Sequence, residues 1–173
     1  QKNQNGAALY EALQAAWNIK DKKRFKAIKA LALKEGVFDN NTNAQIYYAL
    51  SEVDKGNIGL AYAHYDQALK ISPHNPAAVS GLLWLSLEYQ DLPTVESVYN
   101  NNKHPLSQTP EMWLVFANSA KTLKYTKEAD FWYTKLLQTN ERNSAPALLS
   151  YAESLENSGE IRKAYELRKY VAI

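Results

Sequence analysis

The chain has 173 residues, 46% of them hydrophobic, and carries 20 basic against 18 acidic side chains, a formal net charge of +2. This composition excludes an intrinsically disordered tail, and the near balance of charge gives no overall attraction to nucleic acid. No apolar run approaches the roughly 20 residues of a membrane-spanning helix, and the lack of cysteine excludes disulfides and thiolate metal sites.

Small and aromatic residues recur with a period of about 34, which predicts five helix pairs in a single array over residues 1–173: 8–41, 42–75, 76–109, 110–143 and 145–173. Each helix is expected to have about 11–15 residues, within the usual range. In the first pair the period places Ala15 and Ala27 where the two helices touch.

A basic stretch covers the start of the second helix of the first pair: Lys20, Lys22, Lys23, Arg24, Lys26 and Lys29. We interpret this stretch as a solvated helix face, with Phe25, Ile28 and Leu31 turned inward at helical spacing. The alternative is a surface that attracts an acidic partner, anionic lipid or a nucleic-acid backbone.

The second pair shows the pattern most fully, at positions 8, 15, 20, 24, 27 and 32 of the period: Ala49, Gly56, Ala61, Tyr65, Ala68 and Pro73. The sequence Asn40-Asn41-Thr42 has the form of a glycosylation sequon, but we predict that it caps the first helix of this pair.

The later pairs repeat these positions. The third has Leu83, Val95 and Tyr99; the fourth has Trp113, Ala117, Ala129 and Tyr133. After one extra linker residue, the fifth has Leu148, Tyr151, Ala152, Leu155, Gly159 and Ala164. Asn75-Pro76 and Thr109-Pro110 each place a capping side chain before a proline at a helix start.

Small contact residues, a turn glycine, an aromatic knob and a terminating proline resemble the tetratricopeptide repeat. The resemblance implies an all-α superhelix, an α-solenoid of about five helix pairs, in which the first helices line a concave surface that recognises a protein or peptide. Tyr65, Tyr99 and Tyr133, each 34 residues apart, are predicted to lie in the core.

Three segments of the second half carry a narrower resemblance: GLLWLSLEYQDL (81–92), EMWLVFANSAKTLKYTKEADFWYTKLL (111–137) and SYAESLENSGEIRKAYELRKYV (150–171). They resemble the periplasmic repeat region of PelB-type exopolysaccharide export proteins. This resemblance implies a periplasmic scaffold that recruits PelA, a polysaccharide deacetylase and hydrolase, beside the export pore. It also implies a longer protein anchored by an outer-membrane β-barrel, and we expect the sequence to be a piece of such a protein.

No catalytic, metal or cofactor site is expected, because His64, His74 and His104 have no metal-ligand spacing and no nucleophile or phosphate-binding motif occurs. The predicted partner-binding residues occupy positions of the period that face the concave surface: Tyr47, Trp84, Glu88, Asn118, Lys121, Thr122, Glu153 and Asn157. Two alternatives stay open. One is a generic adaptor that binds a peptide; the other is direct binding of exopolysaccharide by the acidic segment 36–100, which carries a net charge of −5.

Overall fold

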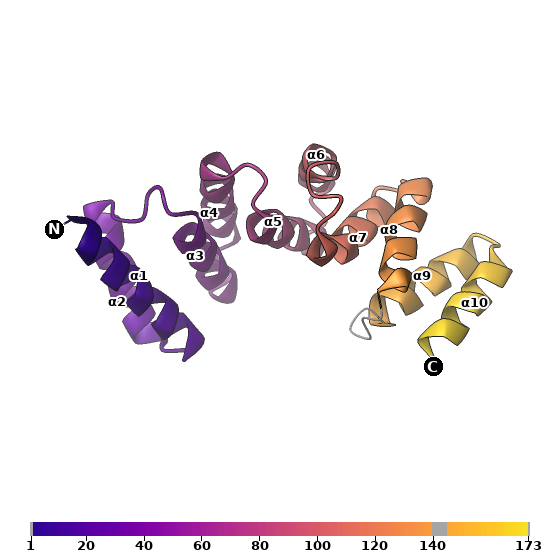
Figure 1. The fold of residues 1–173 in the computed structure, drawn as a ribbon, viewed down its shortest axis with the longest axis horizontal. Coiled ribbons are helices and arrows are strands. Elements are labelled where there is room, and N and C mark those ends of the chain that lie inside the picture. The colour runs from indigo at the N-terminus through magenta and orange to yellow at the C-terminus, as the bar shows by residue number, and fades with distance from the viewer. Residues whose placement is uncertain (1, 140–144, 173) are drawn as a thin grey trace. The chain divides into compact units, whose positions relative to one another are not determined.

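The structure, a computed structural model, describes residues 2–139 and 145–172, and within them it consists of α-helices and one 3-10 turn, with no strand. The helices are α1 (Lys2–Asn18), α2 (Lys22–Glu35), α3 (Thr42–Asp54), α4 (Ile58–Ile71), α5 (Pro76–Glu88), α6 (Leu92–Asn102), α7 (Trp113–Thr122), α8 (Thr126–Gln138), α9 (Ala145–Asn157) and α10 (Ile161–Val171). The 3-10 turn η1 (Pro110–Met112) precedes α7. The all-α prediction is confirmed for this part of the chain (Figure 1).

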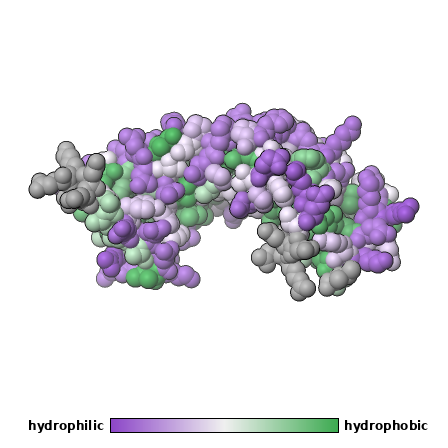
Figure 2. Space-filling model, viewed as in Figure 1, coloured by the Kyte–Doolittle hydropathy of each residue, from purple (hydrophilic) through white to green (hydrophobic). Residues whose placement is uncertain are grey.

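The contacts divide the chain into two compact units, residues 1–82 and 83–173, so that α5 contributes to both. The most extensive packing joins helices that are neighbours in sequence: α1 with α2, α3 with α4, α7 with α8, and α9 with α10. Figure 2 shows a mainly hydrophilic surface, broken by separate hydrophobic patches in both units. These four helix pairs therefore each act as one packing element.

The turn inside every helix pair has the same backbone geometry. The second residue after each first helix is left-handed: Lys20, Gly56, Gln90, Lys124 and Gly159. In each case the next residue donates its N–H to a carbonyl five positions earlier, as Asn57 does to Glu52 at 2.9 Å. This is the Schellman arrangement, which satisfies carbonyls at the helix end. The five turn residues mark equivalent positions in successive repeats, and the intervals between them are 36, 34, 34 and 35 residues.

The spacing of the turn residues corrects the predicted contact positions of the first pair. Ala15 and Ala27 are exposed, and Leu13 and Phe25 are buried in their place. The reason is the loop between α2 and α3, which spans residues 36–41, whereas the loop between α4 and α5 spans only 72–75. The two additional loop residues place the contact positions of α1 and α2 two residues earlier than a strict period of 34 predicts.

The contact positions of the later pairs are confirmed. The contact residues twelve apart are all buried: the alanine pairs Ala49 with Ala61, Ala117 with Ala129 and Ala152 with Ala164, and the larger pair Leu83 with Val95. Tyr65, Tyr99 and Tyr133 are buried as predicted. Close approach of two helices needs small side chains at the crossing point, and the tyrosines fill the space beside it.

Two of the three predicted helix caps form. Asn41 Oδ1 accepts a hydrogen bond from the N–H of Ala44 at 2.9 Å, and Asn75 Oδ1 accepts one from Ala78 at 3.0 Å. Thr109 does not cap with its side chain, so that prediction is wrong. The helical segment there begins with the 3-10 turn η1. Its backbone hydrogen bond from Met112 N–H to Thr109 O, 3.0 Å, closes a tighter ring than an α-turn.

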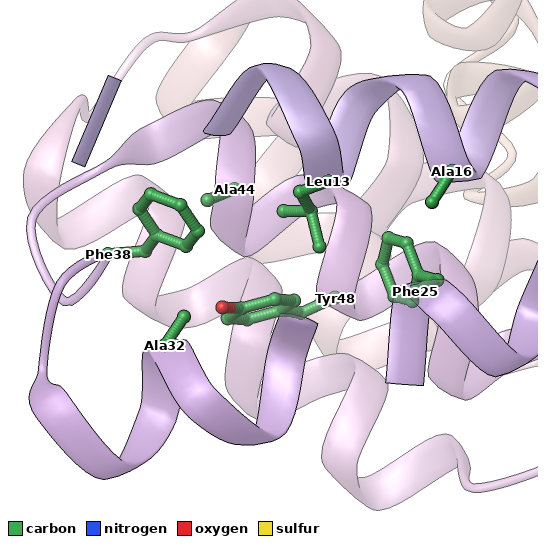
Figure 3. Packing of buried hydrophobic residues seen from close by; sticks show 7 residues of the cluster. All are labelled: Leu13, Ala16, Phe25, Ala32, Phe38, Ala44 and Tyr48. Atoms are coloured by element: carbon green, nitrogen blue, oxygen red, sulfur yellow. The ribbon is translucent and has the colours of Figure 1, made fainter. Parts of the chain in front are cut away.

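The first unit is built around the aromatic ring of Tyr48 on α3 (Figure 3). Leu13 and Ala16 reach it from α1, and Phe25 and Ala32 from α2. The edge of the Phe25 ring meets Tyr48 at a centroid distance of 6.5 Å. This core therefore joins three helices rather than one pair.

The inward face of α2 differs from the prediction at two positions. Phe25 is buried and Ile28 packs partly against the core, but Leu31 is 45% exposed. The buried stripe continues instead through Lys29 and Ala32, because the helical face that starts at Phe25 passes through positions four and seven later. Lys29, predicted as solvated, is thus inside the first unit.

A buried ion pair accommodates Lys29. Its ammonium Nζ lies 2.6 Å from Glu52 Oε1 on α3, and Glu52 also accepts hydrogen bonds from Asn57 at 2.8 Å and Lys55 at 3.3 Å. Burial alone would raise the pKa of Glu52, but the hydrogen bonds from Lys29, Asn57 and Lys55 and the charge of Lys29 outweigh it and lower this pKa to about 2. Glu52 is therefore ionised at neutral pH.

Candidate interaction surface

The first helices of the second unit carry the predicted residues in two rows, defined by distance from the left-handed turn residue of each pair. The row six residues before that turn holds Trp84, Asn118 and Glu153. The row two residues before it holds Glu88, Thr122 and Asn157. Since the rows are four residues apart, the two members on each helix lie on the same face.

Trp84 is the most prominent member. Its side chain is 42% exposed, although Leu83 and Leu85 on either side are buried in the core. Glu88, one turn further along α5, is also exposed. Aromatic side chains are enriched at the centre of protein interfaces, and polar groups such as the Glu88 carboxylate are found at their rim.

Asn118 and Lys121 on α7 are half-buried and bonded within the unit. Tyr133 on α8 donates its hydroxyl to Asn118 Oδ1 at 2.9 Å. Burial raises the pKa of Tyr133, so its hydroxyl stays protonated and remains a donor at neutral pH. Lys121 Nζ lies 2.7 Å from Ser150 Oγ on α9. These two residues thus position helices as well as facing outward.

The remaining members of the surface are polar and exposed: Thr122, Glu153 and Asn157. The hydrogen bond from Lys121 to Ser150 holds α7 beside α9 on this side of the unit. The predicted residues Thr122, Glu153 and Asn157 therefore lie on two helices joined by a hydrogen bond, and their polar side chains face solvent.

Tyr47 belongs to the first unit and has a different setting. Its ring lies 6.4 Å from that of Tyr10 and 6.0 Å from that of Trp17, both on α1. Its hydroxyl accepts a hydrogen bond from Gln14 Nε2 at 3.2 Å. Tyr47 is half-buried and helps to pack α3 on α1, a role that the periodic pattern alone did not reveal.

Comparison with known protein families agrees with this geometry. A family model described as Tetratricopeptide repeat matches residues 1–172. The chain is a tetratricopeptide-repeat protein. No curated protein matches it. Repeats of this family stack helix pairs and serve as scaffolds for protein–protein interaction, which makes a protein the expected class of partner.

The three histidines of this tetratricopeptide-repeat protein form no metal centre. His64 is half-buried, its Nδ1 lies 2.9 Å from Gln45 Oε1, and its ring meets Tyr48 edge-on. Burial lowers the pKa of His64, and the nearby Lys29 charge lowers it further. Across residues 2–139 and 145–172, no three histidine, aspartate or glutamate side chains gather as metal ligands would. None of the helices in the same residues combines the length and apolarity that a membrane crossing requires.

Sequence reasoning missed two concave features of the tetratricopeptide repeats. One is a groove of about 470 Å³ between α8 and α10, floored by Tyr151 and Leu155 of α9. Tyr170 on α10 closes its end by donating a hydrogen bond to the Leu137 carbonyl at 2.8 Å. The other is a cavity of about 420 Å³ in the first unit, beside Trp17 and Phe25. The only sequence signal for the second was the basic stretch that surrounds it.

Proposed function

We propose that the second unit binds a segment of a partner protein across α5, α7 and α9, with Trp84 as the apolar anchor. The observation that carries this proposal is the exposure of Trp84, since the side chains next to it in α5 are buried. Tryptophan is enriched among the few residues that dominate binding energy, because it removes a large apolar area from water with little loss of side-chain entropy.

The polar rows would supply the orientation of the bound segment. Glu88, Thr122 and Asn157 are exposed donors or acceptors at equivalent positions on successive first helices. Hydrogen bonds of this kind add specificity because a wrong partner leaves them unpaired. The hydrogen bonds of Lys121 with Ser150 and of Asn118 with Tyr133 orient α7 toward α9 and α8, which supports a surface that needs little rearrangement on binding.

For the partner, we propose a PelA-type polysaccharide deacetylase and hydrolase, bound in the periplasm next to an outer-membrane export pore. The support is the resemblance to PelB-type proteins. The three segments of this chain that carry it, 81–92, 111–137 and 150–171, lie almost entirely in the second unit, as does Trp84. A scaffold that holds a modifying enzyme at the pore would act on the polymer as it leaves.

The test is isothermal titration calorimetry of the chain with a purified PelA-type enzyme, up to roughly 100 µM, where even micromolar affinity saturates the site. We expect a saturable complex that Trp84→Ala weakens at least tenfold, consistent with the loss of a hot-spot side chain. The control is Tyr165→Ala, which removes another exposed aromatic residue, 62% exposed, from α10.

Absence of any complex with the enzyme would overturn the partner assignment but not the surface. The surface itself would be overturned if an identified protein partner bound the wild type and Trp84→Ala equally well. Binding of purified exopolysaccharide with the same dependence on Trp84 would replace the protein segment by a sugar chain.

A further inference from the structure

The first unit contains a second concave site, which shares no residue with the surface on α5, α7 and α9. The cavity of about 420 Å³ lies where the end of α1, the start of α2 and the end of α3 meet. Ala16, Trp17 and Phe25 provide apolar lining, and the Trp17 and Phe25 rings lie 5.5 Å apart. A volume of this size admits one large side chain of a ligand.

Four lysines line the same cavity: Lys20, Lys22, Lys26 and Lys55. All four are exposed, so their ammonium groups lie at the rim, where solvent and a ligand can reach them. The acidic groups of the lining are Asp21 and Asp54. Four lysines against two aspartates leave the lining with an excess of positive charge. Lys55 also bonds to Glu52 at 3.3 Å, so Lys20, Lys22 and Lys26 are the rim cations without an ion pair to an acidic side chain among the residues that the structure describes.

We propose that this cavity docks an acidic segment of a partner protein, which inserts one apolar side chain beside Trp17 and Phe25 and places carboxylates against the rim lysines. Charge complementarity selects an anionic ligand, and the apolar lining selects one that also carries a hydrophobic group. A protein segment with a hydrophobic residue between acidic residues has both properties.

The shape of the site argues against other anionic partners. A flat membrane surface would reach the rim lysines and leave the cavity floor unfilled. A nucleic-acid backbone would bring its phosphates close to the carboxylates of Asp21 and Asp54, which repel them. A peptide places its carboxylates one side chain at a time, so it can avoid both aspartates while one residue fills the cavity.

The experiment is fluorescence anisotropy with three labelled peptides of about nine residues. The first has one phenylalanine between glutamates; the second replaces the phenylalanine by serine, and the third replaces the glutamates by glutamine. We expect the first peptide to bind at least tenfold more tightly than either of the others, because burial of an aromatic side chain and the ion pairs both contribute. Its affinity should fall as the salt concentration rises.

Variants locate the site. The double substitution Lys22→Glu and Lys26→Glu reverses two rim charges and is expected to weaken the first peptide at least fivefold. The matched control, Lys34→Glu with Lys70→Glu, makes the same change of net charge at exposed positions outside the cavity and should leave the affinity unchanged. Melting temperatures of both double variants verify that they are folded.

Each remaining result overturns the proposal. Equal affinity for the phenylalanine and serine peptides would show that no side chain enters the cavity, and equal weakening by both double variants would show general charge attraction. Preference for a single-stranded oligonucleotide, or for vesicles with about 30% anionic lipid, would assign the patch to nucleic acid or to a membrane. No binding of the first peptide at roughly 500 µM would leave the cavity without this function.

Discussion

The phenol ring of Tyr65 on α4 lies against the backbone of Gly81 on α5. A methyl group added at Gly81 would meet the Tyr65 hydroxyl at 2.5 Å and two ring carbons at 2.6 Å. Tyr65 is buried and cannot swing into solvent without losing its packing. Gly81 is thus required by the close approach of the next helix to the tyrosine, although its own backbone is ordinary helix.

Gly81→Ala is expected to lower the free energy of unfolding by about 1–3 kcal/mol, the usual cost of an overpacked core. Urea denaturation measures it. Gly59→Ala is the matched control, since no atom lies within 4 Å of its added methyl group, and alanine there should be neutral or slightly stabilising. If the two alanine variants were equally stable, the ring of Tyr65 would not be confined as the structure has it.

The ion pair between Lys29 and Glu52 gives a second prediction. Glu52→Gln leaves the buried ammonium of Lys29 without a counter-charge and should destabilise the chain by about 3 kcal/mol. Adding Lys29→Met should restore most of this loss, because no buried charge then remains. The comparison variant is Glu160→Gln, whose partner Lys163 is exposed, and little change is expected there. A double variant no more stable than Glu52→Gln would contradict this account.

The same pair predicts a pH dependence. The folded-state pKa of Glu52, about 2, lies below its ordinary value of 4.5, so its ionisation stabilises the fold above pH 4.5 and this contribution disappears as the pH falls towards 2. The stability difference between the wild type and Glu52→Gln should therefore be largest near neutral pH and shrink through this window. Chemical denaturation at a series of pH values measures the difference. A difference that did not change with pH would show that Glu52 is not ionised in the folded chain.

The left-handed turns supply a fourth prediction. Lys124 has φ of 61°, a conformation that costs an ordinary side chain roughly 1 kcal/mol and glycine almost nothing. Lys124→Gly should raise the thermal midpoint slightly, whereas Gly56→Ala, at φ of 77°, should lower it. Nothing lies within 4 Å of a methyl group at Gly56, so backbone conformation alone is tested there. Opposite signs are required; a stabilised Gly56→Ala would contradict the assigned turn.

Periodicity predicted what the repeats have in common. The buried positions of Tyr65, Tyr99 and Tyr133 follow from their spacing, because a position that packs in one helix pair packs in the next. The register of the first pair was predicted wrongly because the loop between α2 and α3 has two extra residues, which break the period. The turn between α1 and α2 has Lys20 where the second and fifth pairs have a glycine, so no turn residue revealed the shift. A local pattern contains no information on such a shift until the neighbouring helix is placed.

The burial of Lys29 was invisible for a related reason. Its partner Glu52 lies 23 residues away, and a run of lysines on a helix is normally solvated. The exposure of Trp84 agrees with its position in the repeat, but Tyr47 and Asn118 occupy comparable positions and are half-buried by contacts with Gln14 and Tyr133. Which members of a repeat face are free to bind depends on such contacts between helices.

The left-handed turns inside the helix pairs recur at intervals that vary by one or two residues, and the extra residues between the first two pairs lie in the connecting loop. The longer connection before α3 is therefore absorbed between pairs, and the spacing of the buried positions within each pair is kept. A gene encoding such a chain can duplicate or delete a whole pair and still specify a foldable product, so the reach of the protein is free to change in evolution while each binding face is inherited intact.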